Sequence, residues 1–217
     1  MNSPQTSQLV QFLSAQNPNA KFLDRLKIVY RPYICPFDEL LRLIPKEASV
    51  FDIGCGSGQF ALLIAEYSAP KKIKGVEIDA KLVTNAHALL APYTTNTTFH
   101  FEQYNGTDIP EDIADYNIVT MIDVGHHIPR HQQVQFFTQL YARMSSGSRL
   151  IYKDINASSP LVYMNKLHDL FLAGEIGNEL SQHNTKKLFE QIGFTITHES
   201  AKRLWWYPHF TLIATKP

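Results

Sequence analysis

Short apolar runs alternate with segments of helical spacing through the middle of the chain. We predict strands for the runs ASVFDIG, KIKGVEI, TTFHFEQ, YNIVTMI and SRLIYKDI. We predict helices for the segment that opens at Ser57 or Gly58, for Ala80–Leu90, and for Arg130–Met144, which places Val134, Phe137, Leu140 and Tyr141 near one face. Strands that alternate with helices of this length are typical of βαβ units in a parallel, doubly wound (Rossmann-like) sheet. The pattern therefore predicts an α/β fold.

The two ends of the chain depart from this alternation. Helical spacing at Ser7–Ala15, Asp24–Val29 and Phe37–Leu43 predicts a helical cap over residues 1–45. After a helix near Thr185–Gln191, the runs GFTITHES and HFTLIATKP follow with only the loop AKRLWWYP between them, which predicts antiparallel neighbours. We expect one domain over residues 1–217, with an α/β core at 46–217, seven strands of which the last is antiparallel, and a lid-like segment at 158–181.

Charge and cysteine content narrow the range of partners. The 217 residues carry 20 basic and 20 acidic side chains, so no overall field attracts nucleic acid or an anionic membrane, and we expect neither as a partner. Two cysteines, Cys35 and Cys55, form no disulfide framework and indicate a reducing compartment. The polar start lacks the pattern of a secretory signal, and no apolar run reaches the roughly 18 residues that span a bilayer. We expect a cytoplasmic protein.

The segment VFDIGCGSGQF places three glycines, Gly54, Gly56 and Gly58, between a strand and a helix. Glycine in an ordered segment costs conformational entropy, so three of them require a reason. In an open α/β sheet, ligands bind beside the carboxyl ends of the strands, where this loop lies. Glu77 ends the second strand and is placed to accept hydrogen bonds from both hydroxyls of a ribose. Together the loop and the acid indicate a cofactor that contains a nucleoside.

Two cofactor classes fit this arrangement. Gly56-x-Gly58-x-x-Ala61 satisfies the dinucleotide fingerprint, which keeps a nucleotide-dependent oxidoreductase of Rossmann type as an alternative. Asp52, however, precedes the loop, and a carboxylate there suits a ligand with a positive amino group better than one with two phosphates.

The segments FDIGCGSG, GVEID, YNIVTMIDVGHHIP and GSRLIYKDI resemble, in order and spacing, the motifs of class I S-adenosylmethionine-dependent methyltransferases. The resemblance implies methyl transfer from S-adenosylmethionine, with S-adenosylhomocysteine as product. It also implies cofactor-binding roles by position. The glycines line the methionine and ribose portions of the cofactor, and Glu77 holds the ribose diol. The carbonyl of Ile122 meets the amino group, and Arg31 in VYRPYI binds the carboxylate. Asn105 with Gly106, or else Gln103, stands at the adenine position, and Asp52 is also a predicted cofactor-binding residue.

Candidate acceptor residues follow the fourth and fifth strands. His126 and Asp154 are the predicted catalytic residues, because an oxygen acceptor needs a base to remove its proton. His127, Tyr163 and His168 are predicted to contact substrate, the last two from the lid-like segment. The alternative for the histidines is a structural role in the loop that enters the next helix. We expect a small-molecule acceptor methylated on oxygen, nitrogen or carbon, and no metal; a non-catalytic S-adenosylmethionine-binding module is the remaining alternative.

Overall fold

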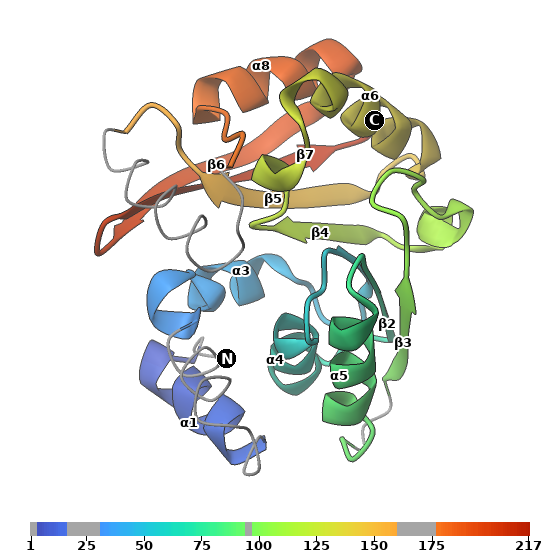
Figure 1. The fold of residues 1–217 in the computed structure, drawn as a ribbon, viewed down its shortest axis with the longest axis vertical. Helices are drawn as coiled ribbons and strands as arrows, with labels where there is room; N and C mark the ends of the chain where they lie inside the picture. Colours follow the sequence, from blue (N-terminus) through green and yellow to red (C-terminus); the bar gives the residue numbers. More distant parts are fainter. Residues whose placement is uncertain (1–3, 17–30, 94–96, 160–176) are drawn as a thin grey trace. The chain divides into compact units, whose positions relative to one another are not determined.

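The computed structural model describes residues 4–16, 31–93, 97–159 and 177–217. The chain forms two compact units, residues 1–106 and residues 107–217. Figure 1 labels the helices and strands of both units. The expected division into a cap, a core and a lid within one domain stays a prediction.

The first unit contains three parallel strands in the order β3-β2-β1. Its elements are α1 (Thr6–Gln16), α3 (Phe37–Leu43), β1 (Ser49–Ile53), α4 (Gln59–Ser68), β2 (Lys72–Glu77), α5 (Ala80–Leu90) and β3 (Thr98–Gln103). Helix α4 is buried along most of its length, as its apolar sequence FALLIA requires. Helix α5 starts where the carboxylate of Asp79 accepts a hydrogen bond from the amide of Lys81.

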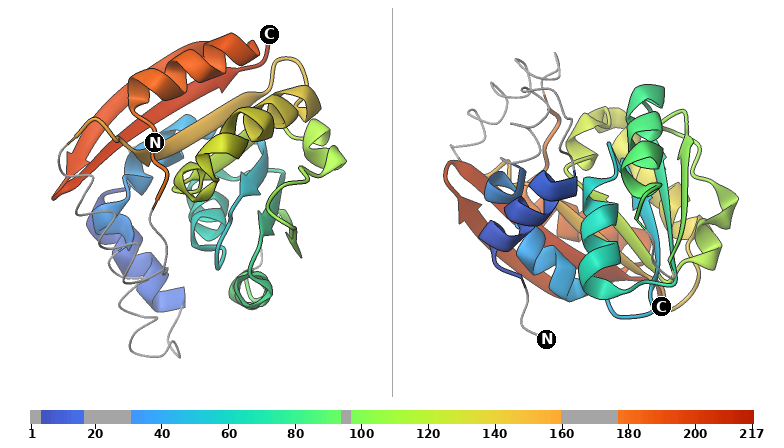
Figure 2. Two further views of the ribbon diagram at one scale, coloured as in Figure 1. Left: turned by 45° about the horizontal axis from the view of Figure 1, so that its top comes forward. Right: turned by 90° about the horizontal axis from the view of Figure 1, so that it is seen from below.

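The second unit contains four strands in the order β4-β5-β7-β6. Its elements are η1 (Glu111–Asp115), β4 (Ile118–Ile122), η2 (Gly125–His127), α6 (Arg130–Arg143), β5 (Arg149–Ile155), α8 (Gln182–Ile192), β6 (Thr195–Leu204) and β7 (Tyr207–Thr215). Strand β4 is parallel to β5, whereas β7 is antiparallel to both of its neighbours. Helices α6 and α8 pack side by side against one face of these strands (Figures 1 and 2). Their aromatic contact, Phe137 with Phe189 at 4.9 Å between ring centroids, also includes Tyr152 of β5.

The expected fold class is confirmed: the described residues contain seven strands in a mixed sheet, with β7 antiparallel, and helices packed against it. The predicted helices Phe37–Leu43 and Ala80–Leu90 have the expected bounds. Asp24–Val29 lies outside the described residues. No helix in the described ranges is long and apolar enough to cross a membrane.

Two details of the prediction were wrong. Val134 was expected in the core, yet it is 58% exposed, and Tyr141 is only half-buried. The buried face of α6 instead includes Gln133, because the side-chain amide of this residue finds carbonyl acceptors in the interior. The segment AKRLWWYP was expected to be a loop, but β6 and β7 pair up to Leu204 and Tyr207, so only Trp205 and Trp206 form the turn.

Candidate functional site

The three glycines of the loop after β1 all adopt left-handed backbone conformations. The φ angles are +71° at Gly54, +54° at Gly56 and +78° at Gly58. The amides of Gly54 and Cys55 both donate to the carbonyl of Val76, at 2.8 and 3.1 Å, which ties the loop to β2. Glycine adopts these angles without the steric penalty of a Cβ atom, so the loop sequence follows from its backbone path.

The space around two of these glycines differs. A Cβ atom on Gly58 would lie 3.0 Å from both Ala86 and Leu90, so the absence of a side chain there allows α5 to pack closely on the start of α4. A Cβ atom on Gly56 would meet nothing within 4 Å. The loop therefore presents bare backbone to open space at Gly56, where a ligand can approach closely.

Glu77 is buried at the end of β2 and its carboxylate organises the loop. Oε2 accepts from the amide of Gly56 at 3.0 Å, and Oε1 accepts from the amides of Ile78 and Asp79 at 2.8 and 3.2 Å. These bonds hold the carboxylate in one orientation beside the glycines. Sequence reasoning placed this acid correctly on its strand, but these backbone contacts become visible only in the folded unit.

Negative charge gathers around the glycine loop. Burial raises the pKa of the Cys55 thiol far above its usual value, and the negative charges of Asp52 and Glu77 raise it further. Cys55 is therefore a protonated, unreactive thiol, and both carboxylates act on the loop. The field suits a ligand that carries hydroxyls and a positive amino group.

Tyr104 lies beside this loop and was missed by sequence reasoning. Burial raises the pKa of Tyr104 to about 12, together with the negative charge of Glu77. Its position directly after the third strand was the available signal, since the neighbouring positions Gln103 and Asn105 were considered. Gln103 donates its amide to the carbonyl of Ile78, Asn105 is exposed, and Gly106 has a φ angle of +84°.

Arg31 is half-buried in a helical turn of the first unit. Its proposed contact with a carboxylate stays a prediction.

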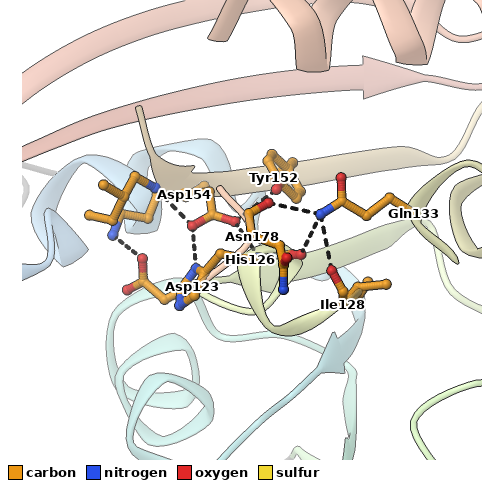
Figure 3. Close-up of polar contacts among 10 residues, drawn as sticks. Asp123, His126, Ile128, Gln133, Tyr152, Asp154 and Asn178 are labelled. Atoms are coloured by element: carbon orange, nitrogen blue, oxygen red, sulfur yellow. Dashed lines mark hydrogen bonds and ion pairs between the residues drawn. The ribbon is translucent and has the colours of Figure 1, made fainter. Parts of the chain in front are cut away.

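The second unit brings His126 and Asp154 together, as Figure 3 shows. His126 Nδ1 lies 2.5 Å from Asp154 Oδ1, and the amide of His126 donates to Oδ2 at 3.0 Å. The two residues are only 4% and 2% exposed. An ionised carboxylate only accepts hydrogen bonds, so Nδ1 of His126 carries a proton in this contact.

Two further donors fix the Asp154 carboxylate. The hydroxyl of Tyr152 donates to Oδ2 at 2.8 Å, and the amide of Ile155 donates to Oδ1 at 2.8 Å. Burial opposes ionisation of Asp154, but the charge and hydrogen bond of His126 outweigh it, so the pKa of Asp154 lies below its usual value. Burial and the Asp154 charge hold the pKa of Tyr152 well above its usual value, so its hydroxyl stays a donor.

Tyr152 was missed by sequence reasoning, although strand periodicity could have found it. Residues two apart on a strand share a face, which places Tyr152 beside Asp154 and puts Lys153 on the other face. Gly125 is needed for the same contact, because a Cβ atom there would overlap the Tyr152 hydroxyl at 2.1 Å.

Gln133 of α6 anchors the loop that carries His126. Its Nε2 lies 3.1 Å from the carbonyl of Ile128 and 3.0 Å from the carbonyl of Asn178 (Figure 3). The amide of Asn178 in turn donates to the carbonyl of His126 at 2.7 Å. The buried amide thus ties η2 to residue 178. A polar residue at a buried helical position was the signal that sequence reasoning overlooked.

Asp123 and Lys153 form a second polar pair in this unit. The fully buried Lys153 ammonium donates to Oδ1 of Asp123, whose backbone has a φ angle of +56°, rare for a residue with a side chain. Ile122, the predicted cofactor contact, is the buried last residue of β4. The pair holds the chain in a strained turn directly after Ile122.

His127 is exposed, and its ring lies 4.2 Å from the ring of His126 between centroids. Tyr163 and His168, the other predicted substrate residues, lie outside the described residues, as does most of the segment 158–181. No cluster that could hold a metal ion occurs among the side chains of the described ranges.

A family model described as "Methyltransferase domain" matches residues 27–199. The chain therefore belongs to the methyltransferase domain family. This membership confirms the resemblance in the glycine loop and the strand ends, and it decides against the oxidoreductase alternative.

One curated relative is the ribosomal protein L11 methyltransferase of Alkaliphilus oremlandii, which is 33% identical over 85 residues. The match covers 39% of this chain and 27% of the relative, so the chain spans about a quarter of that protein.

Solved structures share the fold over most of the chain. The magnesium protoporphyrin IX methyltransferase of Synechocystis, with bound S-adenosylhomocysteine, has a TM-score of 0.69 at 18% identity, covering 92% of this chain and 89% of its own. A chain from the complex that contains the Trm112 methyltransferase activator of Haloferax volcanii has a TM-score of 0.73 at 12% identity, covering 94% and 97%. An S-adenosylmethionine-dependent methyltransferase from Aquifex aeolicus has a TM-score of 0.66 at 12% identity, covering 99% and 100%. At these identities the likeness concerns the fold.

The chain therefore has the fold and the family of a methyltransferase domain, for which S-adenosylmethionine is the expected cofactor. The glycine loop fits this cofactor, because open space lies over Gly56 and carboxylates stand beside it for hydroxyl and amino groups.

Proposed function

We propose that this methyltransferase acts on a small-molecule acceptor whose nucleophile, most favourably an oxygen, loses a proton during transfer. The observation that carries the proposal is the buried pair of His126 and Asp154. S-adenosylmethionine supplies the activated methyl group, so the protein must position the acceptor and remove its proton.

On the cofactor side, Glu77 accepts hydrogen bonds from the ribose hydroxyls, and the backbone at Gly54 and Gly56 lies against the ligand. Asp52 provides negative charge for the amino group, and Arg31 pairs with the carboxylate. Open space at Gly56 and the fixed orientation of Glu77 support these roles. The carbonyl of Ile122 and the Asn105-Gly106 turn complete the proposed set.

On the acceptor side, His126 is the general base and Asp154 is its positioning residue. The carboxylate holds Nδ1–H and stabilises the imidazolium that forms when Nε2 takes a proton. Tyr152 and the amide of Ile155 support the carboxylate in turn. His127, Tyr163 and His168 are proposed to contact the acceptor. A base of this kind favours a hydroxyl over an acceptor that is already deprotonated.

Two relatives bear on the class of acceptor in opposite directions. The Synechocystis protein is named for a small-molecule acceptor, a porphyrin, and the likeness extends over most of both chains. The Alkaliphilus protein is named for a ribosomal protein, but the match covers only 27% of it. The balanced charge of this chain also offers no general attraction for nucleic acid. We therefore place the small molecule first.

The acceptor class is tested with methyl-labelled S-adenosylmethionine and an extract of the source cells, divided by ultrafiltration. The proposal expects label to appear in the fraction that passes the membrane. Label confined to retained protein or RNA would overturn it. The passing fraction then provides the assay in which the base is examined.

The base is tested with His126→Ala, which should lower turnover by about 10²–10⁴-fold. Affinity for S-adenosylhomocysteine, measured by calorimetry, should change little, and the wild-type rate should rise with pH as the imidazole loses its proton. His131→Ala, on the exposed surface of α6, is the matched control and should retain turnover. Normal turnover in folded His126→Ala with an unchanged pH profile would remove His126 from the chemistry.

A further inference from the structure

The turn between β6 and β7 exposes both tryptophans of the chain. Leu204 pairs with Tyr207, so Trp205 and Trp206 form a two-residue turn at the end of a long hairpin. Trp205 is 61% exposed and Trp206 is 40% exposed, with their ring centroids 5.4 Å apart. We call residues 202–207 the Trp tip. Two large apolar rings thus lie together at the surface instead of in the core.

The backbone of the Trp tip is unfavourable for the residue that occupies it. Trp205 has a φ angle of +56°, a region that bulky side chains rarely adopt and in which glycine is usual at a two-residue hairpin turn. A tryptophan in this position is strained and gains little burial in return. Strain of this kind at an exposed residue points to a role outside the stability of the fold.

The sequence around the Trp tip carries charge of one sign. From Ser200 to Phe210 the sequence SAKRLWWYPHF contains two permanent cations, Lys202 and Arg203, and no acidic residue. Tryptophans flanked by basic side chains are typical of the polar interface of a lipid bilayer, where the ring sits at headgroup level and the cation meets anionic lipid. We propose that the Trp tip binds the surface of an anionic lipid bilayer.

This local cluster differs from the average over the chain. The balance of 20 basic and 20 acidic residues predicts no attraction to an anionic membrane. Surface attraction to charged lipid falls off within about 10 Å, however, so the charges nearest the lipid decide it.

The position of the tip connects it with the edge of the sheet that carries Asp154. Asp154 pairs with Phe210 and Ile155 pairs with His209, so β5 ends where β7 still continues toward the turn. The amide of Asn156, directly after β5, donates to the carbonyl of Pro208 at 2.7 Å. The tip therefore extends past the carboxyl end of β5, the edge at which His126 lies. The inference goes beyond the proposed function and does not depend on it.

The tryptophan content gives a direct test. Because both tryptophans of the chain lie in the tip, the intrinsic fluorescence of the full-length protein reports on this site alone. Vesicles of equal parts phosphatidylglycerol and phosphatidylcholine should shift the emission to shorter wavelength, and brominated phosphatidylcholine in the same vesicles should quench it. Vesicles of phosphatidylcholine alone should bind much more weakly. Neither cofactor nor acceptor is present, so the result is independent of methyl transfer.

Variants separate the two parts of the proposal. Lys202→Gln with Arg203→Gln should weaken binding to the anionic vesicles by about tenfold to thirtyfold, as measured by co-sedimentation. Trp205→Gly should also weaken binding, while its melting temperature equals or exceeds that of the wild type because the turn strain is relieved. Val134→Ser removes an exposed apolar side chain of α6 and should bind as the wild type does.

An unchanged emission spectrum with anionic vesicles overturns the proposal. So does equal binding by the double charge variant and the wild type. An emission shift that appears without vesicles as protein concentration rises would instead assign the tip to contact between two copies of this chain.

Discussion

At the level of single residues, Glu77 is the side chain on which the cofactor loop depends most. Its carboxylate accepts from three backbone amides, including that of Gly56 in the loop itself. One carboxylate thus has two tasks, since it shapes the empty loop and is proposed to hold the ribose. The conservative exchange for glutamine retains the volume but places an amide donor where the backbone already donates.

Glu77→Gln and Glu77→Ala should therefore weaken binding of S-adenosylhomocysteine by about ten- to several-hundred-fold, because each hydrogen bond to a charged group contributes about 1.5–3 kcal/mol. Isothermal calorimetry on the folded variants measures the change. Glu47→Gln, an exposed carboxylate that precedes β1, should bind as the wild type does. A change below about twofold in the Glu77 variants would mean that the ribose is held by other groups.

Asp154 is the corresponding residue of the second unit. Although burial opposes its ionisation, its partners, His126 first among them, keep the pKa of Asp154 below its usual value. A carboxyl group with a lowered pKa in the folded state stabilises the fold above its unfolded-state pKa, about 3.9. That stabilisation is lost as the pH falls through the lower folded-state pKa.

Asp154→Asn should lower the free energy of unfolding near neutral pH by about 2–4 kcal/mol, because it breaks a buried charged pair. The difference between the variant and the wild type should shrink as the pH falls below about 4, where the unfolded-state carboxyl begins to bind a proton, and vanish below the lower folded-state pKa. Urea unfolding across this pH range measures both effects. Asp115→Asn, at the end of η1 on the surface, should show neither. A difference that is constant with pH would exclude ionisation of Asp154 as its source.

At the scale of elements, glycine is needed in the loop for two different reasons, close helix packing and open space, which the sequence pattern does not distinguish. Gly58 admits the side chains of α5, whereas Gly56 leaves open space above the loop. Gly75 in β2 is a third case, because a Cβ atom there would lie 2.7 Å from Cys55 and from Phe101. Glycine therefore serves helix packing at one position, strand packing at another and ligand access at a third.

Gly56→Ala and Gly58→Ala should separate these demands. In both variants the free energy of unfolding should fall by about 1–2 kcal/mol, because alanine is unfavourable in the left-handed region. Gly58→Ala should lose about 1–3 kcal/mol more, because its methyl group meets Ala86 and Leu90. Gly56→Ala should instead lose affinity for S-adenosylhomocysteine beyond what its small loss of stability explains. Urea unfolding measures the stability of the two variants, and calorimetry measures their affinity. A larger loss of stability in Gly56→Ala than in Gly58→Ala would contradict this assignment.

Elements were predictable where one period of apolar residues dominated. The runs that became β1 and β4 are nearly continuous apolar segments between turn residues, as expected of strands covered on both faces. The buried face of α6 was predicted only in part: Phe137 and Leu140 are buried as expected, but Val134 counts as apolar in any pattern and Gln133 as polar. The choice between them depended on carbonyls of residues 128 and 178, which no local window contains.

At the scale of the whole molecule, the family and the cofactor were predictable, while the acceptor chemistry was not fully so. The order of strands and helices and the glycine loop are local patterns that repeat along the chain, and they indicated an S-adenosylmethionine-dependent methyltransferase. His126 and Asp154 were named as candidates from their positions after two strands. Their contact, 28 residues apart in sequence, follows from the parallel pairing of β4 with β5.

The sequence by itself determined the succession of elements, the class of fold and the position of the cofactor loop, because backbone preference and apolar period are properties of short segments. Only the tertiary structure decided which polar groups are buried together, as for Tyr152 and Gln133, and which apolar rings remain outside, as for Trp205 and Trp206. Burial and pairing join residues far apart in the chain, and their free energy depends on the neighbours that the completed fold brings to each side chain.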